Sequence, residues 1–125
     1  MSLVAHQHIQ KYLSKCRKYR LDKNDLNSIL RLSTHLRVFG LLSAIGYLNQ
    51  SNAQAGEVRE RTVPVWESLL GQMLDENNPL ERQQIMETVV EMARNQPKLY
   101  MATWRRSLML ANHWNFWGRA YQEEE

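Results

Sequence analysis

The sequence predicts an all-α protein, a compact bundle of about five helices. Apolar residues recur along most of the chain at the three- and four-residue spacing of amphipathic helices. No segment alternates strictly between apolar and polar residues, and no Asn-Gly or Asp-Gly pair marks a hairpin turn. A chain of 125 residues also has the size of one domain that can bury a single core, which we take as residues 1–125.

The first two helices are predicted within the first 50 residues. One helix runs from about Leu3 to Tyr19, with its apolar side chains on one stripe. The second helix begins near Asn24 or Asp25, because either side chain is a good N-cap. Its apolar face continues beyond Arg37 into the most apolar segment of the chain.

Two glycines, Gly40 and Gly46, interrupt the helical rhythm of that apolar segment. A glycine inside a helix costs about 1 kcal/mol relative to alanine. Either the segment breaks into two elements there, or another part of the protein approaches its backbone closely. The residues themselves leave both explanations open.

A polar segment, residues 49–57, is predicted as a loop, and three more helices follow it. The third helix starts after Thr62, with a proline in its first turn where the missing N–H does no harm. The fourth starts with Asn78 as its N-cap and ends just before Pro97. Pro97 then opens a long last helix that extends to about Gln122.

Composition indicates a cytoplasmic protein without a membrane segment. Hydrophobic residues make up 43% of the chain and charged residues 23%, as in ordinary globular proteins. No apolar run approaches the roughly 18 residues that a membrane span needs, and we expect no signal peptide at the start. Cys16 is the only cysteine, which excludes an internal disulfide and fits a reducing compartment.

The net charge of +3 conceals a strong asymmetry along the chain. Residues 1–40 hold eight Lys or Arg against two Asp, a net charge of +6. Residues 62–95 hold six acidic residues against two Arg, a net charge of −4. The split suggests a basic end for a polyanion and an acidic end for a basic partner, or copies that meet basic end to acidic end. A solvated surface without a partner is the plain alternative.

The residues that could carry chemistry do not form a catalytic or metal-binding pattern. His6 and His8 point about 200° apart on a helix, so we expect an exposed pair at a frayed end rather than two ligands of one ion. His35 and His113 are each isolated, and Cys16 lies on an apolar stripe. We therefore expect no metal, no cofactor and no enzymatic activity.

The four tryptophans are predicted mainly as core residues. Trp66 lies in the middle of an apolar helical stripe. Trp104, Trp114 and Trp117 cannot all share one narrow face of the last helix, so one of them could instead lie on a contact surface.

The basic residues are the strongest functional signal. Polybasic helical ends commonly hold a phosphate backbone without reading sequence. The second helix is too apolar to lie in a groove as the recognition helix of a helix-turn-helix. We therefore predict sequence-independent binding of RNA or single-stranded nucleic acid. The candidate residues are Lys15, Arg17, Lys18, Arg20, Lys23, Arg37, Arg105, Arg106 and Arg119.

The segment "LRVFGLLSAIGYLNQ" resembles the small α-helical subunit of the type III-B CRISPR effector, the Cmr complex. That family carries an apolar-Arg-x-x-Gly-Leu-x-x-Ala-x-x-aromatic-Leu pattern there. The matching positions are Arg37, Gly40, Leu41, Ala44, Tyr47 and Leu48.

The last helix is similar to a second signature of the same family. The residues that fit it are Tyr100, Leu108, Trp114, Arg119 and Ala120, and the residues that depart from it are Asn115 and Gly118. The two signatures cover about a third of the chain, and the small subunit of the type III-A (Csm) complex is similar enough to be confused with it.

The resemblance implies a non-catalytic subunit that stacks in several copies along the crRNA-bound backbone of the effector. Its expected partners are other CRISPR effector subunits, the crRNA and target RNA, and further copies of itself. It also implies that Gly40 and Gly46 lie in one helix, where they let a neighbouring helix pack closely; a break at Phe39-Gly40 is the rival explanation. Two other function classes stay open: a helical DNA-binding regulator and a small helical enzyme of the chorismate-mutase type.

Overall fold

Six helices follow one another in the computed structural model, which describes residues 1–50 and 57–122, with side chains from residue 62 onward in the second range. They are α1 (Ser2–Lys15), α2 (Lys23–Val38), α3 (Leu41–Leu48), α4 (Glu57–Leu74), α5 (Arg82–Asn95) and α6 (Pro97–Ala120). No strand occurs in these two ranges, so the predicted all-α class is confirmed. The described chain has one helix more than the five predicted, because the second predicted helix is divided in two.

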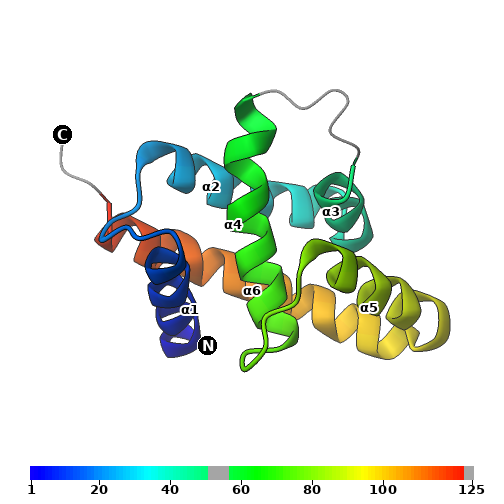
Figure 1. Cartoon of the computed structure of the whole chain (residues 1–125). Helices are drawn as coiled ribbons and strands as arrows, with labels where there is room; N and C mark the ends of the chain where they lie inside the picture. The colour runs from blue at the N-terminus through cyan, green and yellow to red at the C-terminus, as the bar shows by residue number, and fades with distance from the viewer. Residues whose placement is uncertain (51–56, 123–125) are drawn as a thin grey trace.

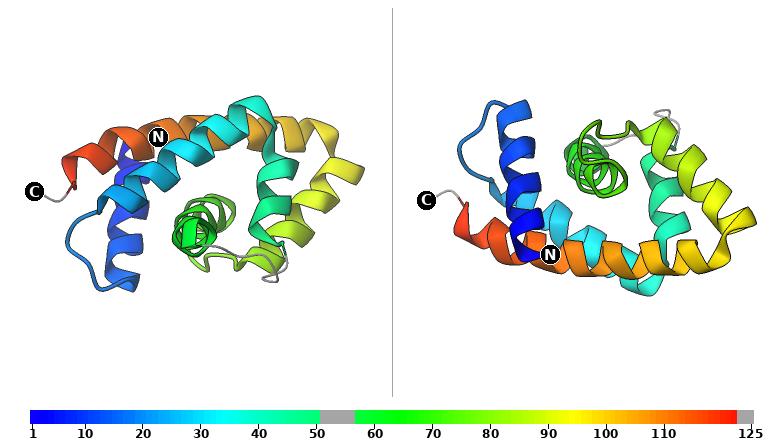
Figure 2. Two further views of the ribbon diagram at one scale, coloured as in Figure 1. Left: turned by 90° about the horizontal axis from the view of Figure 1, so that it is seen from above. Right: turned by 90° about the horizontal axis from the view of Figure 1, so that it is seen from below.

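Helix α4 lies inside a U formed by the other five helices (Figure 2). Seen along its axis, α4 has α1 on one side and α3 with α5 on the other, while α2 and α6 run side by side across the base. Figure 1 shows the same arrangement from the front, with α4 crossing α2 and α6. The fold is therefore a compact bundle in which α2 and α6 form a two-helix layer.

The core fills the space between α4 and the surrounding helices. Trp114 is fully buried and Trp66 is 2% exposed, so the prediction that Trp66 belongs to the core is confirmed. The Trp66 indole N–H donates to the Ser28 carbonyl oxygen at 2.9 Å, which satisfies its polar atom inside the core. This bond ties α4 to the middle of α2.

Helix α1 ends at Lys15, four residues before the predicted end at Tyr19. Arg17 has a φ of 55°, in the left-handed region where a helix cannot continue. The Leu21 N–H then donates to the Tyr121 carbonyl oxygen at 2.8 Å, which fastens the connection between α1 and α2 to the end of α6. The apolar stripe predicted for the first helix does not show where this turn begins.

Helix α2 begins at Lys23, and its N-cap is Asp22 rather than the predicted Asn24 or Asp25. The Asp25 N–H donates to Asp22 Oδ1 at 2.8 Å, and the Asp22 N–H donates to Asp25 Oδ2 at 3.1 Å. This reciprocal capping box satisfies two backbone donors at the helix start. Asp25 therefore does take part in the cap, but as the third residue after the N-cap.

The helix predicted to run through both glycines breaks at Gly40, so the rival explanation is the correct one. Gly40 has a φ of 92° and is the N-cap of α3. Other residues rarely adopt this conformation, so the positive φ itself explains this glycine, whereas the Trp104 ring would lie in ordinary contact with a Cβ, at 3.8 Å. At Gly46 no atom lies within 4 Å of where a Cβ would be, so no close approach explains that glycine.

Two later helix starts also differ from the prediction. Helix α4 begins at Glu57, so Pro64 lies inside it instead of in its first turn; of the predicted loop, residues 51–56 lie outside the described residues. Helix α5 begins at Arg82, because Asp75 Oδ1 accepts the N–H groups of Asn77 and Asn78 and holds that segment in a turn. The predicted end of α5 and the start of α6 at Pro97 are confirmed.

Candidate nucleic-acid interface

The α2–α6 layer brings together cations that lie far apart in the sequence. Helix α2 begins beside the end of α6, and the Trp104 indole N–H donates to the Leu36 carbonyl oxygen at 2.8 Å near the other end of α2. The two helices are therefore antiparallel, and each end of the layer carries residues from both. Lys23 and Arg119 lie at one end, and Arg37 and Arg105 at the other.

Exposed residues repeat every seven positions on the outward side of both helices. Residues seven apart in a helix point in nearly the same direction, since the drift is about 20° per heptad. We call this surface the α2–α6 face. It comprises Lys23, Leu30 and Arg37 of α2 and Lys98, Arg105, Asn112 and Arg119 of α6, all exposed.

A hollow between the helices shows that the two columns belong to the same face. It has a volume of about 310 Å³ and is lined by Lys23 and Leu30 from α2 and by Asn115 and Arg119 from α6. Ser33 and Asn112 join the same two helices by a 3.2 Å hydrogen bond. Lys23 and Arg119, 96 positions apart in the sequence, therefore line one concave surface.

The α2–α6 face carries no exposed carboxylate of its own. Helix α6 contains no Asp or Glu, and the only acidic residue in α2, Asp25, is 4% exposed. Arg105 and Arg119 are about 21 Å apart along α6 at the usual helical rise. Positive charge therefore extends along the layer without a neutralising partner on either helix, which favours binding of an extended polyanion.

Large apolar side chains lie between these cations. Phe116 is 65% exposed and Met109 is 50% exposed on the outward side of α6. An exposed aromatic beside arginines is a typical contact for single-stranded nucleic acid, because a base can stack on the ring. Sequence reasoning missed Phe116 and Lys98. The spacing of Lys98, Arg105 and Arg119, seven and then fourteen residues, was a signal that could have found Lys98.

Arg20 lies at the end of the α2–α6 face, in the connection between α1 and α2, whereas Arg17 follows α1 directly, with its N–H bonded to the Ser14 carbonyl oxygen. Both side chains are exposed. Arg20 Nη1 donates to the Gln122 carbonyl oxygen at 3.3 Å, which places Arg20 at the end of α6. The structure therefore brings five of the nine predicted residues to the α2–α6 face and its end: Arg20, Lys23, Arg37, Arg105 and Arg119.

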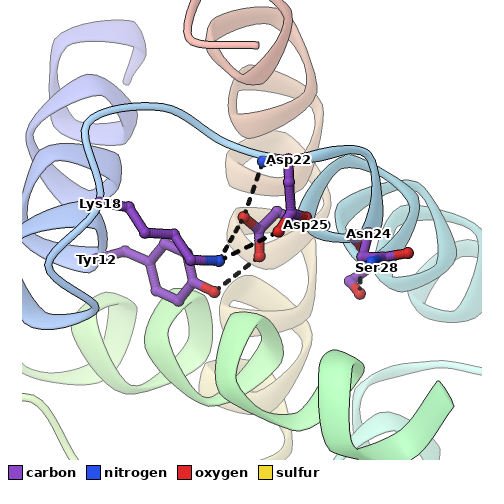
Figure 3. A network of polar contacts seen from close by, with 6 residues as sticks. All are labelled: Tyr12, Lys18, Asp22, Asn24, Asp25 and Ser28. Carbon is purple, nitrogen blue, oxygen red and sulfur yellow. Dashed lines mark hydrogen bonds and ion pairs between the residues drawn. The ribbon is translucent and has the colours of Figure 1, made fainter. Parts of the chain in front are cut away.

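Lys18 is engaged within the fold (Figure 3). Its Nζ lies 3.4 Å from Asp22 Oδ2 and 3.2 Å from Asp25 Oδ2, and the Tyr12 hydroxyl donates to Asp25 Oδ1 at 3.0 Å. Burial alone would lower the pKa of Lys18, but the charges and hydrogen bonds of Asp25 and Asp22 raise it. The prediction that Lys18 contacts RNA is therefore revised: its charge neutralises two carboxylates of the capping box.

The other two predicted cations, Lys15 and Arg106, face different surroundings. Lys15 lines a separate hollow of about 300 Å³ together with Glu67 and Glu81, so carboxylates accompany it. Arg106 lies on another side of α6, where its charge helps to lower the pKa of His8. Neither residue belongs to the α2–α6 face.

The two N-terminal histidines are not the exposed pair that we predicted. His8 is 1% exposed, and its Nε2 lies 3.0 Å from Glu76 Oε1. His6 is half-buried, with its Nε2 2.8 Å from the Tyr121 hydroxyl oxygen and its ring 4.6 Å from that of Trp117. Both therefore attach α1 to other elements. Among the side chains that the structure describes, in residues 1–50 and 62–122, no group of three His, Cys, Asp or Glu could hold a metal.

The tryptophans of α6 are structural. Trp114 is buried, and the half-buried Trp117 donates its indole N–H to the Ser2 carbonyl oxygen at 3.1 Å. Trp104 makes the bond to Leu36 described above. The exposed aromatic residue of this helix is Phe116, not one of the tryptophans that we had considered for a contact surface.

Comparison with known protein families, with curated proteins and with solved structures finds no match to this chain. Within the part of the chain that the structure describes, no helix is long and apolar enough to cross a membrane.

Proposed function

We propose that this protein is a non-catalytic small subunit of a CRISPR type III RNA-guided, target-RNA-cleaving effector complex, of the Cmr type. In this role it contacts guide and target RNA through the α2–α6 face. Several copies stack along the crRNA-bound backbone of the complex, and other subunits cut the target. The proposal places the protein in the cytoplasm, because a chain with a single cysteine fits a reducing compartment.

The observation that supports RNA binding best is the α2–α6 face itself. It carries cations from two helices and no exposed carboxylate, and the exposed ring of Phe116 lies beside these cations. Lys and Arg side chains can contact phosphates without selecting a sequence. A subunit that must accept any guide needs this kind of contact, because the sequence is read by base pairing instead.

The family assignment is supported by the resemblance of residues 36–50 and of the last helix, and the fold adds one physical reason for that resemblance. Gly40 starts α3 with a positive φ against the Trp104 ring, so this signature position has a backbone role. Arg37, one turn earlier, is exposed on the α2–α6 face. One signature thus contains both a turn that the fold requires and a cation available to RNA.

Co-purification tests this function. The full chain, tagged at one end, is expressed in its source cells and recovered at low salt. We expect other CRISPR effector subunits and short RNAs of one length class to accompany it. Recovery with duplex DNA and no effector subunit would contradict the proposal and favour a DNA-binding regulator. Recovery without either nucleic acid or effector subunits would also contradict it.

A further inference from the structure

A second hollow, lined by aromatic side chains, lies on the other side of α2 from α6. It has a volume of about 360 Å³, within the usual range for small-molecule sites. We call it the aromatic hollow. Its lining includes Leu30, Arg31, Thr34, His35, Tyr47 and Trp66.

Three rings from three helices form the apolar part of the aromatic hollow. The centroid of Trp66 lies 4.9 Å from that of Tyr47 and 5.4 Å from that of His35, while Tyr47 and His35 are 6.4 Å apart. Trp66 is buried and fixed by its bond to Ser28, so it forms the floor on which the two half-buried rings rest. The ring surfaces are therefore held in place before any ligand arrives.

His35 behaves as a neutral ring in this setting. Its Nε2 lies 2.9 Å from the Ser43 hydroxyl oxygen, and burial lowers its pKa below the ordinary value of 6.5. A neutral imidazole at pH 7 leaves Arg31 as the cation of the lining. The walls thus favour a flat, uncharged ring system.

Arg31 places a positive charge at the edge of the aromatic hollow. Its side chain is exposed, and Nη2 donates to the Ser28 hydroxyl oxygen at 3.4 Å. No carboxylate pairs with it among the side chains that the structure describes. A guanidinium has five N–H donors in a planar fork, so most of them remain for an anion with the geometry of phosphate.

We propose that the aromatic hollow binds a nucleotide, with the base on the ring of Tyr47 and the phosphate on Arg31. Leu30 lines both this hollow and the one on the α2–α6 face, so the two sites share one ridge of α2. The ligand is therefore either a free nucleotide or a base turned out of an RNA strand on that face; the second source rests on the proposed function.

Titration of mononucleotides tests this site without RNA. Adenosine 5′-monophosphate, adenosine and inorganic phosphate are each added to the full chain and followed by amide chemical shifts in NMR. We expect the nucleotide to bind with a Kd of about 1 mM or tighter, and adenosine and phosphate to bind more weakly. Shift changes should centre on α2 and α3.

Two variants separate the contacts. Arg31→Gln should weaken the nucleotide about tenfold and leave adenosine unchanged, since it contacts only phosphate. Tyr47→Leu should weaken both about tenfold, whereas Tyr47→Phe keeps the ring and should retain both. Arg94→Gln and Tyr19→Leu, at exposed positions elsewhere, are matched controls that should change neither affinity. Circular dichroism checks that each variant is folded.

The inference is wrong if neither nucleotide nor adenosine binds, if phosphate alone binds as well as the nucleotide, or if Arg31→Gln weakens adenosine equally. Binding of a 12-nucleotide RNA to the same variants distinguishes the two proposals. If RNA binds but no nucleotide does, the aromatic hollow is not a site and the proposed function stands. If nucleotides bind but RNA does not, the site is for free nucleotides and the proposed function fails.

Discussion

The connection between α1 and α2 and the outward face of α2 and α6 are both basic in sequence, yet their charges have different surroundings. In the connection, Lys18 is held by Asp22 and Asp25, two acidic residues within seven positions of it. On the α2–α6 face, Arg105 and Arg119 lie on a helix without any carboxylate. A basic residue is available to a polyanion only where the fold has not supplied its counter-charge.

The largest expected effect is on stability, in the connection between α1 and α2, where Lys18 contacts Asp25. Its carboxylate accepts hydrogen bonds from the Tyr12 hydroxyl, the Asp22 N–H and Lys18 while it is 4% exposed. Asp25→Ala leaves these donors without a partner and should lower the free energy of unfolding by about 3 kcal/mol. Urea denaturation followed by circular dichroism measures it. Tyr12→Phe, which removes one bond, should cost about 1 kcal/mol, and an equal loss from both variants would contradict the network.

The next effect extends the comparison to α6, where the charge of Arg106 acts on His8 and Arg105 belongs to the α2–α6 face. Burial lowers the pKa of His8, and the charges of Lys11 and Arg106 lower it further. The hydrogen bond and the charge of Glu76 raise this pKa, but by less than burial lowers it. As the pH falls through about 6.5, His8 therefore takes up a proton in the unfolded chain but not yet in the folded protein.

Stability should be complete above pH 6.5 and fall as the pH drops below it, by up to about 1.4 kcal/mol per pH unit for one histidine. His35, whose pKa is also lowered, adds to the same slope. His8→Gln should make the slope between pH 6.5 and 5 shallower in thermal denaturation. An unchanged slope in His8→Gln would show that His8 is protonated in the fold.

A smaller effect distinguishes Lys18 from its neighbours in sequence. Because Lys18 is 37% exposed, Lys18→Ala should cost only about 1 kcal/mol or less, but it should leave the salt dependence of RNA binding unchanged. Arg20→Ala should do the opposite: little change in stability and a shallower salt dependence. Filter binding at salt concentrations from about 50 to about 200 mM measures this dependence. A shallower slope for Lys18→Ala would restore it to the interface.

The helices could be predicted from the sequence better than their ends could. The apolar stripes around Trp66 and the proline at the start of α6 depend on local pattern, and both were interpreted correctly. The end of α1 depends on a left-handed residue, Arg17, and the start of α5 on a turn held by Asp75. Such features follow from tertiary contacts that no local pattern contains.

The candidate site, too, could be predicted from the sequence only in its local features. Composition correctly indicated which residues are basic, but not which of them the fold engages. Lys23 and Arg119 meet only because α2 and α6 are antiparallel, a pairing that depends on the contacts of Leu21 and Trp104. Gly40 was assigned to the wrong alternative, since the resemblance gives a residue pattern and carries no φ value.

The smallest expected effect concerns association between copies. The basic α2–α6 face of one copy can attract the acidic exposed side of α5 of another, which carries Glu87 and Glu91. Exposed pairs contribute only about 0–1 kcal/mol each, so the isolated protein should show a weak monomer–oligomer equilibrium that disappears as salt rises. Sedimentation velocity at rising salt measures this equilibrium. A two-fold dimer that persists at about 1 M salt, where charge is screened within about 3 Å, would contradict it.

The central claim is that the α2–α6 face binds RNA through phosphates, and one pair of variants tests it most directly. Arg105→Ala with Arg119→Ala removes two cations of the face, and Arg82→Ala with Arg94→Ala removes two exposed cations of α5, an equal change in net charge. For single-stranded RNA of any sequence, the slope of log affinity against log salt should fall by about 1.4 in the first variant, or ~0.7 for each lost phosphate contact. It should stay unchanged in the second. Equal changes in both would mean that only net charge matters, and no change in the first would mean that this face does not bind RNA.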